Sequence, residues 1–394
     1  MLHLSKISAF FIAFVMFWSY QANVYAEEQP QPEVISEAAC LLDTETNAVL
    51  YNKNADVKMY PASLTKIATA IYAIEKGDLD SVAVVSGNAV RQDGTRVYLV
   101  EGEQLPLKML VQGMLVNSGN DAAVAIAEHL DGSVEAFSAK INDYLKTKVG
   151  VQNTHFMNPS GLHDENHYTT ALDMAVITNY AMKNPIFAEI YGTKKLWWEG
   201  QSWKTNILTH HAMLKGEFPY SGIIGGKTGY TSQSKQTLAT TADNGKIKLT
   251  AVVLKSEQKQ DKYRDTAVLF DYGFSGYQHS ILNRNETFTS EQEEFFPKQD
   301  TVITEDLAGT VKKVNDSGLL TIENHNGQLL QSVQLMSKKE TEHASVSQLS
   351  EGKKKIEKEE QKQGLDAVNS VYGVLIIGAA LIIITAGRKF AKKV

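Results

Sequence analysis

The pattern of hydrophobic and polar positions divides residues 36–276 into strand-like ends and a helical middle. Near the start, AACLLDTETNAVLYNKNA places two apolar runs around a polar turn, which predicts a β-hairpin from Cys40 to Tyr51. The segments DAAVAIAEHL and ALDMAVITNYAM then repeat apolar residues at helical spacing. After residue 225, KQTLATTA and KIKLTAVVLK flank the polar turn DNG, so strands return. We therefore expect an α/β (α+β) domain, an antiparallel sheet covered by helices, with its first and last strands adjacent.

The pattern changes again from residue 277. Short apolar runs over residues 277–336 alternate with two turn signals, residues 315–318 and the Asn326-Gly327 pair. Because Asn-Gly between strand-like runs is a strong hairpin signal, this stretch predicts a small all-β domain. At the other end, residues 27–35 include EEQPQPEV and show no apolar period, which predicts a mobile N-terminal segment.

The beginning of the chain has the pattern of a secretory signal peptide. Lys6 precedes an apolar run, and small residues follow it as far as VYA. We therefore expect residues 1–26 to be removed by cleavage after Ala26. An uncleaved membrane anchor is the alternative, although the apolar run is short for a complete span.

The C-terminal end predicts a membrane anchor. Residues 367–387 are uncharged and long enough for a transmembrane helix. Residues 388–394 are rich in lysine and arginine, so the positive-inside rule places this tail in the cytoplasm. Residues 337–366 are charged and poor in large apolar side chains, which predicts a linker or stalk. We expect localisation at the cell membrane by a single C-terminal anchor, with the large domain on the extracellular or periplasmic side.

Composition narrows the range of partners. The chain has 394 residues, 43% of them hydrophobic, which is enough for one large and one small soluble domain. A net charge of only −6 is too near neutral to indicate nucleic acid as a partner. The single cysteine, Cys40, excludes an internal disulfide framework and is expected to be a buried structural thiol.

A first candidate for chemistry is PASLTKIATA, in which Ser63 and Lys66 lie one helical turn apart. Their side chains can share one face of a helix, because residues three apart are neighbours there. One interpretation is a capping serine followed by a solvated lysine, and the other is a nucleophile with its own base. Spacing alone does not decide, since Ser-x-x-Lys also begins at Ser232, Ser256 and Ser350.

A second candidate is the tripeptide Ser118-Gly119-Asn120, which leads into an alanine-rich helix. Simple helix capping is the alternative, because serine and asparagine are favoured there. The same tripeptide also occurs at residues 86–88, where no comparable helix follows. The tripeptide is therefore informative only together with other motifs.

A third candidate is Lys227-Thr228-Gly229, which follows two glycines and precedes a strand. Glycine permits close approach of the backbone to a ligand, and the point charge of Lys227 suits a carboxylate. The alternative is an ordinary edge strand with a solvated lysine.

The three motifs occur in the order that is the signature of penicillin-binding proteins and serine β-lactamases. The chain resembles, in particular, the low-molecular-mass penicillin-binding proteins that act as serine D-alanyl-D-alanine carboxypeptidases. The segments PASLTKIATA, SGNDAAVAIAEH, NPSGLHDENHYTTALDMA and GGKTGYT carry this resemblance over residues 36–275. It implies a β-lactamase/transpeptidase-like antiparallel sheet with a helical subdomain at residues 36–276, followed by a C-terminal β domain.

The resemblance also implies a reaction and a substrate. A serine acyl-enzyme would release the terminal D-alanine of peptidoglycan stems that end in D-Ala-D-Ala, with no cofactor or metal, and β-lactams would acylate the same serine. Ser63 would be the nucleophile and Lys66 its general base. Ser118 would relay a proton to the leaving amine, and Asn120 would orient Lys66 and the substrate.

The resemblance assigns substrate binding to a second group of residues. Lys227 and Thr228 would hold the terminal carboxylate, and Arg264 would lie near it. Gly229 would let the strand approach the substrate. The backbone N–H groups of Tyr230 and of the nucleophile would form the oxyanion hole.

Other functions remain open from the residues alone. His163 and His167, with the pair His210-His211, raise the hypothesis of a zinc peptidase, but the order His-Glu-x-x-His is absent. A non-catalytic penicillin-binding receptor of the cell wall would keep the pocket without turnover. A β-lactamase or transpeptidase of the same fold is a further alternative, although the acidic deacylation motif of class A β-lactamases is not found.

Overall fold

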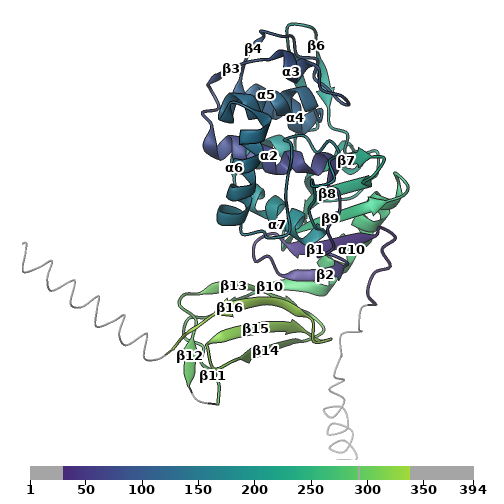
Figure 1. Ribbon diagram of the computed structural model, residues 1–394. Coiled ribbons are helices and arrows are strands. Elements are labelled where there is room, and N and C mark those ends of the chain that lie inside the picture. Colours follow the sequence, from purple (N-terminus) through teal and green to yellow (C-terminus); the bar gives the residue numbers. More distant parts are fainter. Residues whose placement is uncertain (1–29, 292, 338–394) are drawn as a thin grey trace, which may run out of the picture. The chain divides into compact units, whose positions relative to one another are not determined.

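The computed structural model describes residues 30–291 and 293–337, and its contacts divide the chain into two units (Figure 1). The predicted signal peptide, stalk, transmembrane segment and basic tail lie outside the described residues, apart from residue 337. Among the described residues, the first unit comprises residues 30–283, 300–313 and 320–333, and the second comprises residues 284–291, 293–299, 314–319 and 334–337.

The first unit is built on a five-stranded antiparallel sheet with the order β2-β1-β9-β8-β7. The hairpin predicted from Cys40 to Tyr51 is confirmed, and β1 also pairs with β9, with Leu41 opposite Ala251. The first and last strands are therefore neighbours, as expected. The strands are β1 (Ala38–Asp43), β2 (Val49–Lys53), β7 (Ile223–Thr231), β8 (Lys235–Asp243) and β9 (Lys248–Ser256).

Helices cover both faces of this sheet, which explains why every residue of β1 is buried. Leu41 points toward Gly273 of α10, whereas its neighbours Cys40 and Leu42 join the core formed with the other helices. Alternate residues of a strand face opposite sides. Burial raises the pKa of the Cys40 thiol, which is consistent with a structural role.

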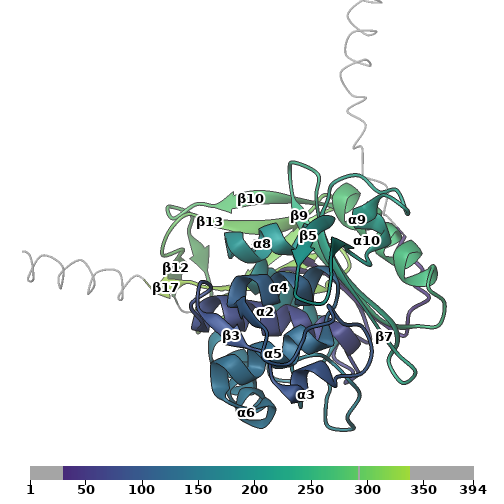
Figure 2. The ribbon, with the colours of Figure 1, turned by 90° about the horizontal axis from the view of Figure 1, so that it is seen from above.

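The helical middle forms a cluster around α2, beside α4 and α5 (Figures 1 and 2). Helix α2 begins directly after the 3₁₀ turn η1 and ends at Lys76, with Gly77 as its C-cap. The longer helices are α2 (Thr65–Lys76), α4 (Leu107–Val116), α5 (Asn120–Asp131), α6 (Val134–Tyr144), α7 (Ala171–Met182), α8 (Pro185–Tyr191) and α10 (Asp261–Gly276). The short ones are η1 (Ala62–Leu64), α3 (Gly87–Val90), the π-helical turn η2 (Leu145–Val149) and α9 (Ala212–Lys215).

Residues 277–337 contain strands but no helix in their described part, so the all-β prediction is confirmed there. The two predicted turns connect β14 to β15 and β15 to β16. Strand β10 pairs with β13, β14-β15-β16 form one sheet, and β11-β12-β17 form another. The bounds are β10 (Tyr277–Leu282), β11 (Phe288–Thr289), β12 (Glu294–Phe296), β13 (Thr301–Asp306), β14 (Thr310–Val314), β15 (Leu319–Asn324), β16 (Leu329–Gln334) and β17 (Met336–Ser337).

The division into units does not follow the predicted boundary at residue 277, because β10, β13 and most of β14, β15 and β16 belong to the unit of the large sheet. A buried carboxylate explains this grouping. Asp43 of β1 lies 2.6 Å from Nε2 of His279 and accepts a 3.0 Å hydrogen bond from the Thr304 hydroxyl.

Two short hairpins complete the described strands: β3 (Val82–Val84) with β4 (Gln104–Pro106), and β5 (Lys195–Glu199) with β6 (Lys204–Leu208).

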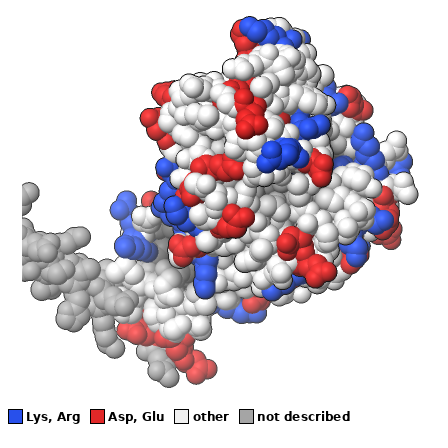
Figure 3. Space-filling view, turned by 45° about the horizontal axis from the view of Figure 1, so that its top comes forward, with Lys and Arg blue, Asp and Glu red and all other residues white. Residues whose placement is uncertain are grey.

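Acidic and basic side chains are interspersed over the face shown in Figure 3, without a continuous basic stripe. Over residues 30–291 and 293–337, no helix combines the length and apolar character required to cross a membrane. The predicted transmembrane segment, residues 367–387, is not part of that range.

Candidate active site

Ser63 lies in η1 and Lys66 in the first turn of α2, so the chain turns from one to the other within three residues. Nζ of Lys66 is 3.0 Å from Oγ of Ser63. Ser63 makes no capping hydrogen bond to the helix, and Lys66 is completely buried. The interpretation as a capping serine with a solvated lysine is therefore wrong.

The surroundings of Lys66 indicate how its amine is used. Nζ donates to Oδ1 of Asn120 at 2.7 Å and to the carbonyl oxygen of Ser160 at 2.6 Å. Both of these oxygens can only accept, whereas the hydroxyl of Ser63 can accept or donate. A neutral amine has two N–H groups and one lone pair. It can therefore satisfy both oxygens and direct its lone pair toward Ser63.

The electrostatics favour this neutral amine. Burial lowers the pKa of Lys66 well below its ordinary value, and the positive charge of Lys227 lowers it further. The carboxylate of Asp121 opposes these two effects. A lysine in this environment can serve as a base at a pH where an exposed lysine is protonated.

Ser118 lies in the turn between α4 and α5, where its backbone is left-handed with φ of 62°, and Asn120 is the first residue of α5. The N-cap of α5 is Gly119 and neither side chain caps the helix, so the capping interpretation is wrong here. It is right for the copy of the tripeptide at residues 86–88, because Oγ of Ser86 accepts from the backbone N–H of Ala89 and caps α3. Asn120 is fixed by a 2.6 Å hydrogen bond from Nδ2 to the carbonyl oxygen of Asp93.

Lys227 lies on β7, which is indeed an edge strand, but its side chain is only 3% exposed. Nζ donates to Oγ of Ser118 at 2.9 Å and to the carbonyl oxygen of Thr228 at 2.9 Å. Burial, followed by the charge of Lys262, lowers the pKa of Lys227 to about 7. The three motifs therefore meet at one place: Lys66 contacts Ser63 and Asn120, and Lys227 contacts Ser118.

Gly229 brings β7 against the nucleophile turn. A Cβ at this position would lie 2.9 Å from the backbone nitrogen of Ser63 and 2.3 Å from Oγ1 of Thr237. Both distances are too short for a real Cβ, so only glycine fits without a shift. The next residue, Tyr230, is 62% exposed.

Arg264 is placed on α10, where its guanidinium lies 3.7 Å from Asp261 and 3.4 Å from the Gln260 side chain. In the described part of the chain it makes no hydrogen bond or ion pair with the other predicted site residues. Lys262, two positions earlier, is buried and donates to Oε1 of Gln236 at 2.8 Å. No sequence pattern selects Lys262, because a lysine in a charged helix is usually solvated.

The loop NPSGLHDENH supplies groups that the motifs did not predict. The carbonyl oxygen of Ser160 binds Lys66, and that of Pro159 accepts from the Thr69 hydroxyl at 2.8 Å. Gly161 has a φ of 85°, and a Cβ there would lie 1.8 Å from the carbonyl oxygen of Ala62. This loop therefore packs directly against the residue that precedes the nucleophile.

We predict that Gly161→Ala destabilises the protein by at least about 3 kcal/mol, because an unfavourable φ and a backbone clash act together. Gly132 is a matched control, since its φ is 82° and a Cβ there meets no atom within 4 Å. Gly132→Ala should cost only about 1 kcal/mol, the conformational term. Urea unfolding of both variants measures the difference, and equal losses would contradict the close contact.

Two histidines of the zinc hypothesis, His167 and His211, use both ring nitrogens in hydrogen bonds within the protein. Nδ1 of His167 accepts from the backbone N–H of Met157, and its Nε2 lies 2.8 Å from Oγ1 of Thr65. In the same way, Nδ1 of His211 accepts from the backbone N–H of Leu214, and its Nε2 lies 2.8 Å from Oγ1 of Thr240. Among residues 30–291 and 293–337, no group of three or more His, Cys, Asp or Glu side chains is arranged to hold a metal ion.

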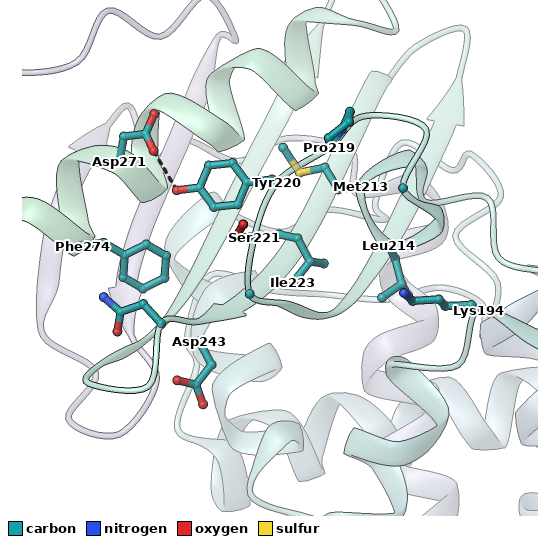
Figure 4. Close-up of a pocket in the computed structure, with 13 residues that line it drawn as sticks. Lys194, Met213, Leu214, Pro219, Tyr220, Ser221, Ile223, Asp243, Asp271 and Phe274 are labelled. Carbon is teal, nitrogen blue, oxygen red and sulfur yellow. Dashed lines mark hydrogen bonds between the residues drawn. The ribbon is translucent and has the colours of Figure 1, made fainter.

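A hollow of about 1020 Å³ lies elsewhere on the first unit (Figure 4). Tyr220, Asp271 and Phe274 line it, with Ile223 at the beginning of β7. It includes none of the predicted site residues, although Lys227 lies further along the same strand. The chemistry is therefore carried by the contacts of the three motifs and not by this hollow.

Comparison with known proteins gives one family, described as D-alanyl-D-alanine carboxypeptidase (Peptidase_S11), whose model matches residues 24–258. D-alanyl-D-alanine carboxypeptidase DacF of Bacillus subtilis (strain 168) is 32% identical over 284 residues, which are 69% of this chain and 72% of the relative. DacA of Escherichia coli (strain K12) is 30% identical and is matched over 62% of each protein.

Solved structures share the fold. A D-alanyl-D-alanine carboxypeptidase from Mycobacterium tuberculosis H37Rv has a TM-score of 0.60 and 30% identity, covering 64% of this chain and 95% of that structure. DacD from Francisella tularensis has a TM-score of 0.67 and 23% identity, covering 81% of this chain and 97% of that structure. At that identity the second likeness shows the fold alone.

Proposed function

The chain belongs to the D-alanyl-D-alanine carboxypeptidase family, and on this premise we propose how its residues remove the terminal D-alanine from peptidoglycan peptide stems. It is a serine-type enzyme of this family, with peptidoglycan ends as substrates and β-lactams as acylating inhibitors. The observation that carries the proposal is the contact between Ser63 and Lys66. The amine of Lys66 is buried, has two acceptor-only partners and lies 3.0 Å from Oγ of Ser63.

The reaction is an acyl transfer in two steps. Oγ of Ser63 attacks the carbonyl carbon of the penultimate D-alanine while Lys66 takes the hydroxyl proton. The tetrahedral intermediate breaks its C–N bond, and the proton held by Lys66 passes through the Ser118 hydroxyl to the leaving amine of the terminal D-alanine, so Lys66 is neutral again. Water then attacks the acyl-enzyme, which releases the shortened peptide and returns the proton to Ser63. Asn120 holds Lys66 and the substrate amide in place.

The position of β7 supports a role in binding the end of the chain. Lys227 supplies the positive charge and Thr228 a hydroxyl for the terminal carboxylate. Because Gly229 lies against the backbone nitrogen of Ser63, the N–H groups of Ser63 and Tyr230 can together face the same substrate oxygen. We assign these two donors to the oxyanion hole. We also propose that Arg264, on α10, lies near the terminal carboxylate of the substrate.

Membrane attachment completes the proposal. We infer that residues 1–26 direct export, that residues 367–387 anchor the chain in the cell membrane, and that residues 337–366 are a stalk between anchor and enzyme. This places the catalytic domain outside the membrane, where its polymeric substrate lies. The evidence is the composition of these segments.

We predict that the purified full chain in detergent releases D-alanine from a peptide that ends in D-Ala-D-Ala. The same peptide with a C-terminal amide should react at least about 10²-fold more slowly in kcat/KM, because the buried charge of Lys227 then lacks its partner. Enzymatic measurement of free D-alanine or D-alaninamide compares the two.

The alternatives give different products. Equal rates on acid and amide would contradict the carboxylate site. A folded protein that binds penicillin at Ser63 but releases no D-alanine would be a receptor. Transfer to an added amine in preference to water would indicate a transpeptidase, and rapid penicillin hydrolysis a β-lactamase.

A further inference from the structure

His167 lies in the loop before α7 and has no part in the reaction proposed above. It is only 2% exposed, and its ring stacks on Phe156 with centroids 4.9 Å apart. A buried imidazole requires hydrogen-bond partners. Those partners connect it to the nucleophile turn, which lies about a hundred positions earlier in the chain.

The direction of the hydrogen bonds fixes the proton on His167. The backbone N–H of Met157 donates to Nδ1 at 3.1 Å, so a neutral ring carries its proton on Nε2. Nε2 lies 2.8 Å from Oγ1 of Thr65, and the Thr65 hydroxyl donates to the carbonyl oxygen of Ala62 at 2.9 Å. Each group donates to the next, so the relay runs from His167 through Thr65 to Ala62.

Ala62 is an unusual end for such a relay. Its φ is 50°, a left-handed conformation that a residue with a Cβ rarely adopts. The peptide bond that follows it is planar, and its carbonyl oxygen and N–H point in opposite directions. Holding the oxygen of Ala62 therefore fixes the direction of the N–H of Ser63.

We propose that His167 is a positioning residue, which acts through the Thr65 hydroxyl to aim the backbone N–H of Ser63 at the substrate oxygen. The inference rests on the proposed use of that N–H in the oxyanion hole. Preorganised donors matter because their orientation is set before charge develops. Burial lowers the pKa of His167 to about 3, although the charge of Asp164 opposes this shift, so the ring keeps its acceptor nitrogen throughout the working pH range.

The test compares variants that break and preserve the relay. His167→Phe and Thr65→Val remove its hydrogen bonds, whereas His167→Gln and Thr65→Ser keep a donor and a hydroxyl. Phe156→Leu is the matched control, because it loosens the packing of the same loop without touching a hydrogen bond of the relay. The measurements on the full chain are the rate of Ser63 acylation by a penicillin, kcat and KM for D-alanine release, and thermal unfolding.

We expect His167→Phe and Thr65→Val each to slow acylation and lower kcat by about 10–100-fold, somewhat less than the removal of an oxyanion donor. KM should stay within about threefold, and the double variant should be no slower than Thr65→Val alone, since both act through one relay. His167→Gln and Thr65→Ser should recover most of the rate. Phe156→Leu should lower the unfolding temperature while kcat stays within about threefold of the parent.

Three results would overturn the inference. They are a raised KM with unchanged kcat, reductions in kcat that multiply in the double variant, or a reduction in kcat in Phe156→Leu equal to that in His167→Phe. If His167→Phe does not fold, the Thr65→Val and Thr65→Ser pair decides, because valine replaces threonine at nearly constant volume. All comparisons are made with an active parent. An inactive parent would instead count against the proposed function.

Discussion

Ser63→Ala is expected to abolish D-alanine release, with kcat reduced at least about 10⁴-fold. The variant removes the one atom that forms the acyl bond, and within the described part of the chain no other hydroxyl is hydrogen-bonded to Lys66. The protein should still fold, because Ser63 makes no capping bond to η1 or α2. Mass spectrometry of the penicillin-treated chain should find an adduct in the parent and none in the variant.

Ser86→Ala is the matched control for this experiment. Ser86 also belongs to a Ser-Gly-Asn sequence, but its hydroxyl caps α3 and contacts Glu128. Its loss should reduce stability by about 1 kcal/mol and leave kcat near that of the parent. D-alanine release that survived in Ser63→Ala would refute the assignment of the nucleophile and return attention to the histidines.

Much of this site was predictable because its motifs are local. The strand–helix–strand order follows from the spacing at which apolar residues recur along the chain, which depends on neighbouring residues alone. The strand predicted to follow Lys227 is β8, but the sequence did not predict that Lys227 and the two preceding glycines themselves lie on β7. The order of the three motifs identified a family, and the structure brings their side chains into contact.

What the sequence left open depends on tertiary position. The tripeptides at Ser86 and Ser118 are identical, yet one is a cap and the other binds Lys227. The acceptor that completes the site of Lys66 is a backbone carbonyl, that of Ser160, and any residue type could provide it. The contact between His167 and Thr65 joins positions 102 residues apart, which no local pattern reports.

Lys66→Met should slow the acylation of Ser63 at least about 10³-fold, within the range expected for loss of a general base. Methionine approximates the length and volume of the lysine stem but accepts no proton. The change also leaves Oδ1 of Asn120 and the carbonyl oxygen of Ser160 without their donor, at a cost of about 1–3 kcal/mol each in stability. Single-turnover acylation by a penicillin, with urea unfolding beside it, separates the two effects.

The pH dependence of the acylation rate tests the role of Lys66 as a base directly. The active base is the neutral amine, so the acylation rate of the parent should rise with pH through the lowered pKa of Lys66 and then level off. For the D-Ala-D-Ala peptide, kcat/KM should fall again above about pH 7, where Lys227 loses the proton that attracts the carboxylate. Lys66→Arg is the control, because it keeps the positive charge and stays protonated. If Lys66→Arg acylated at the parent's rate, charge rather than proton transfer would explain the role of this residue.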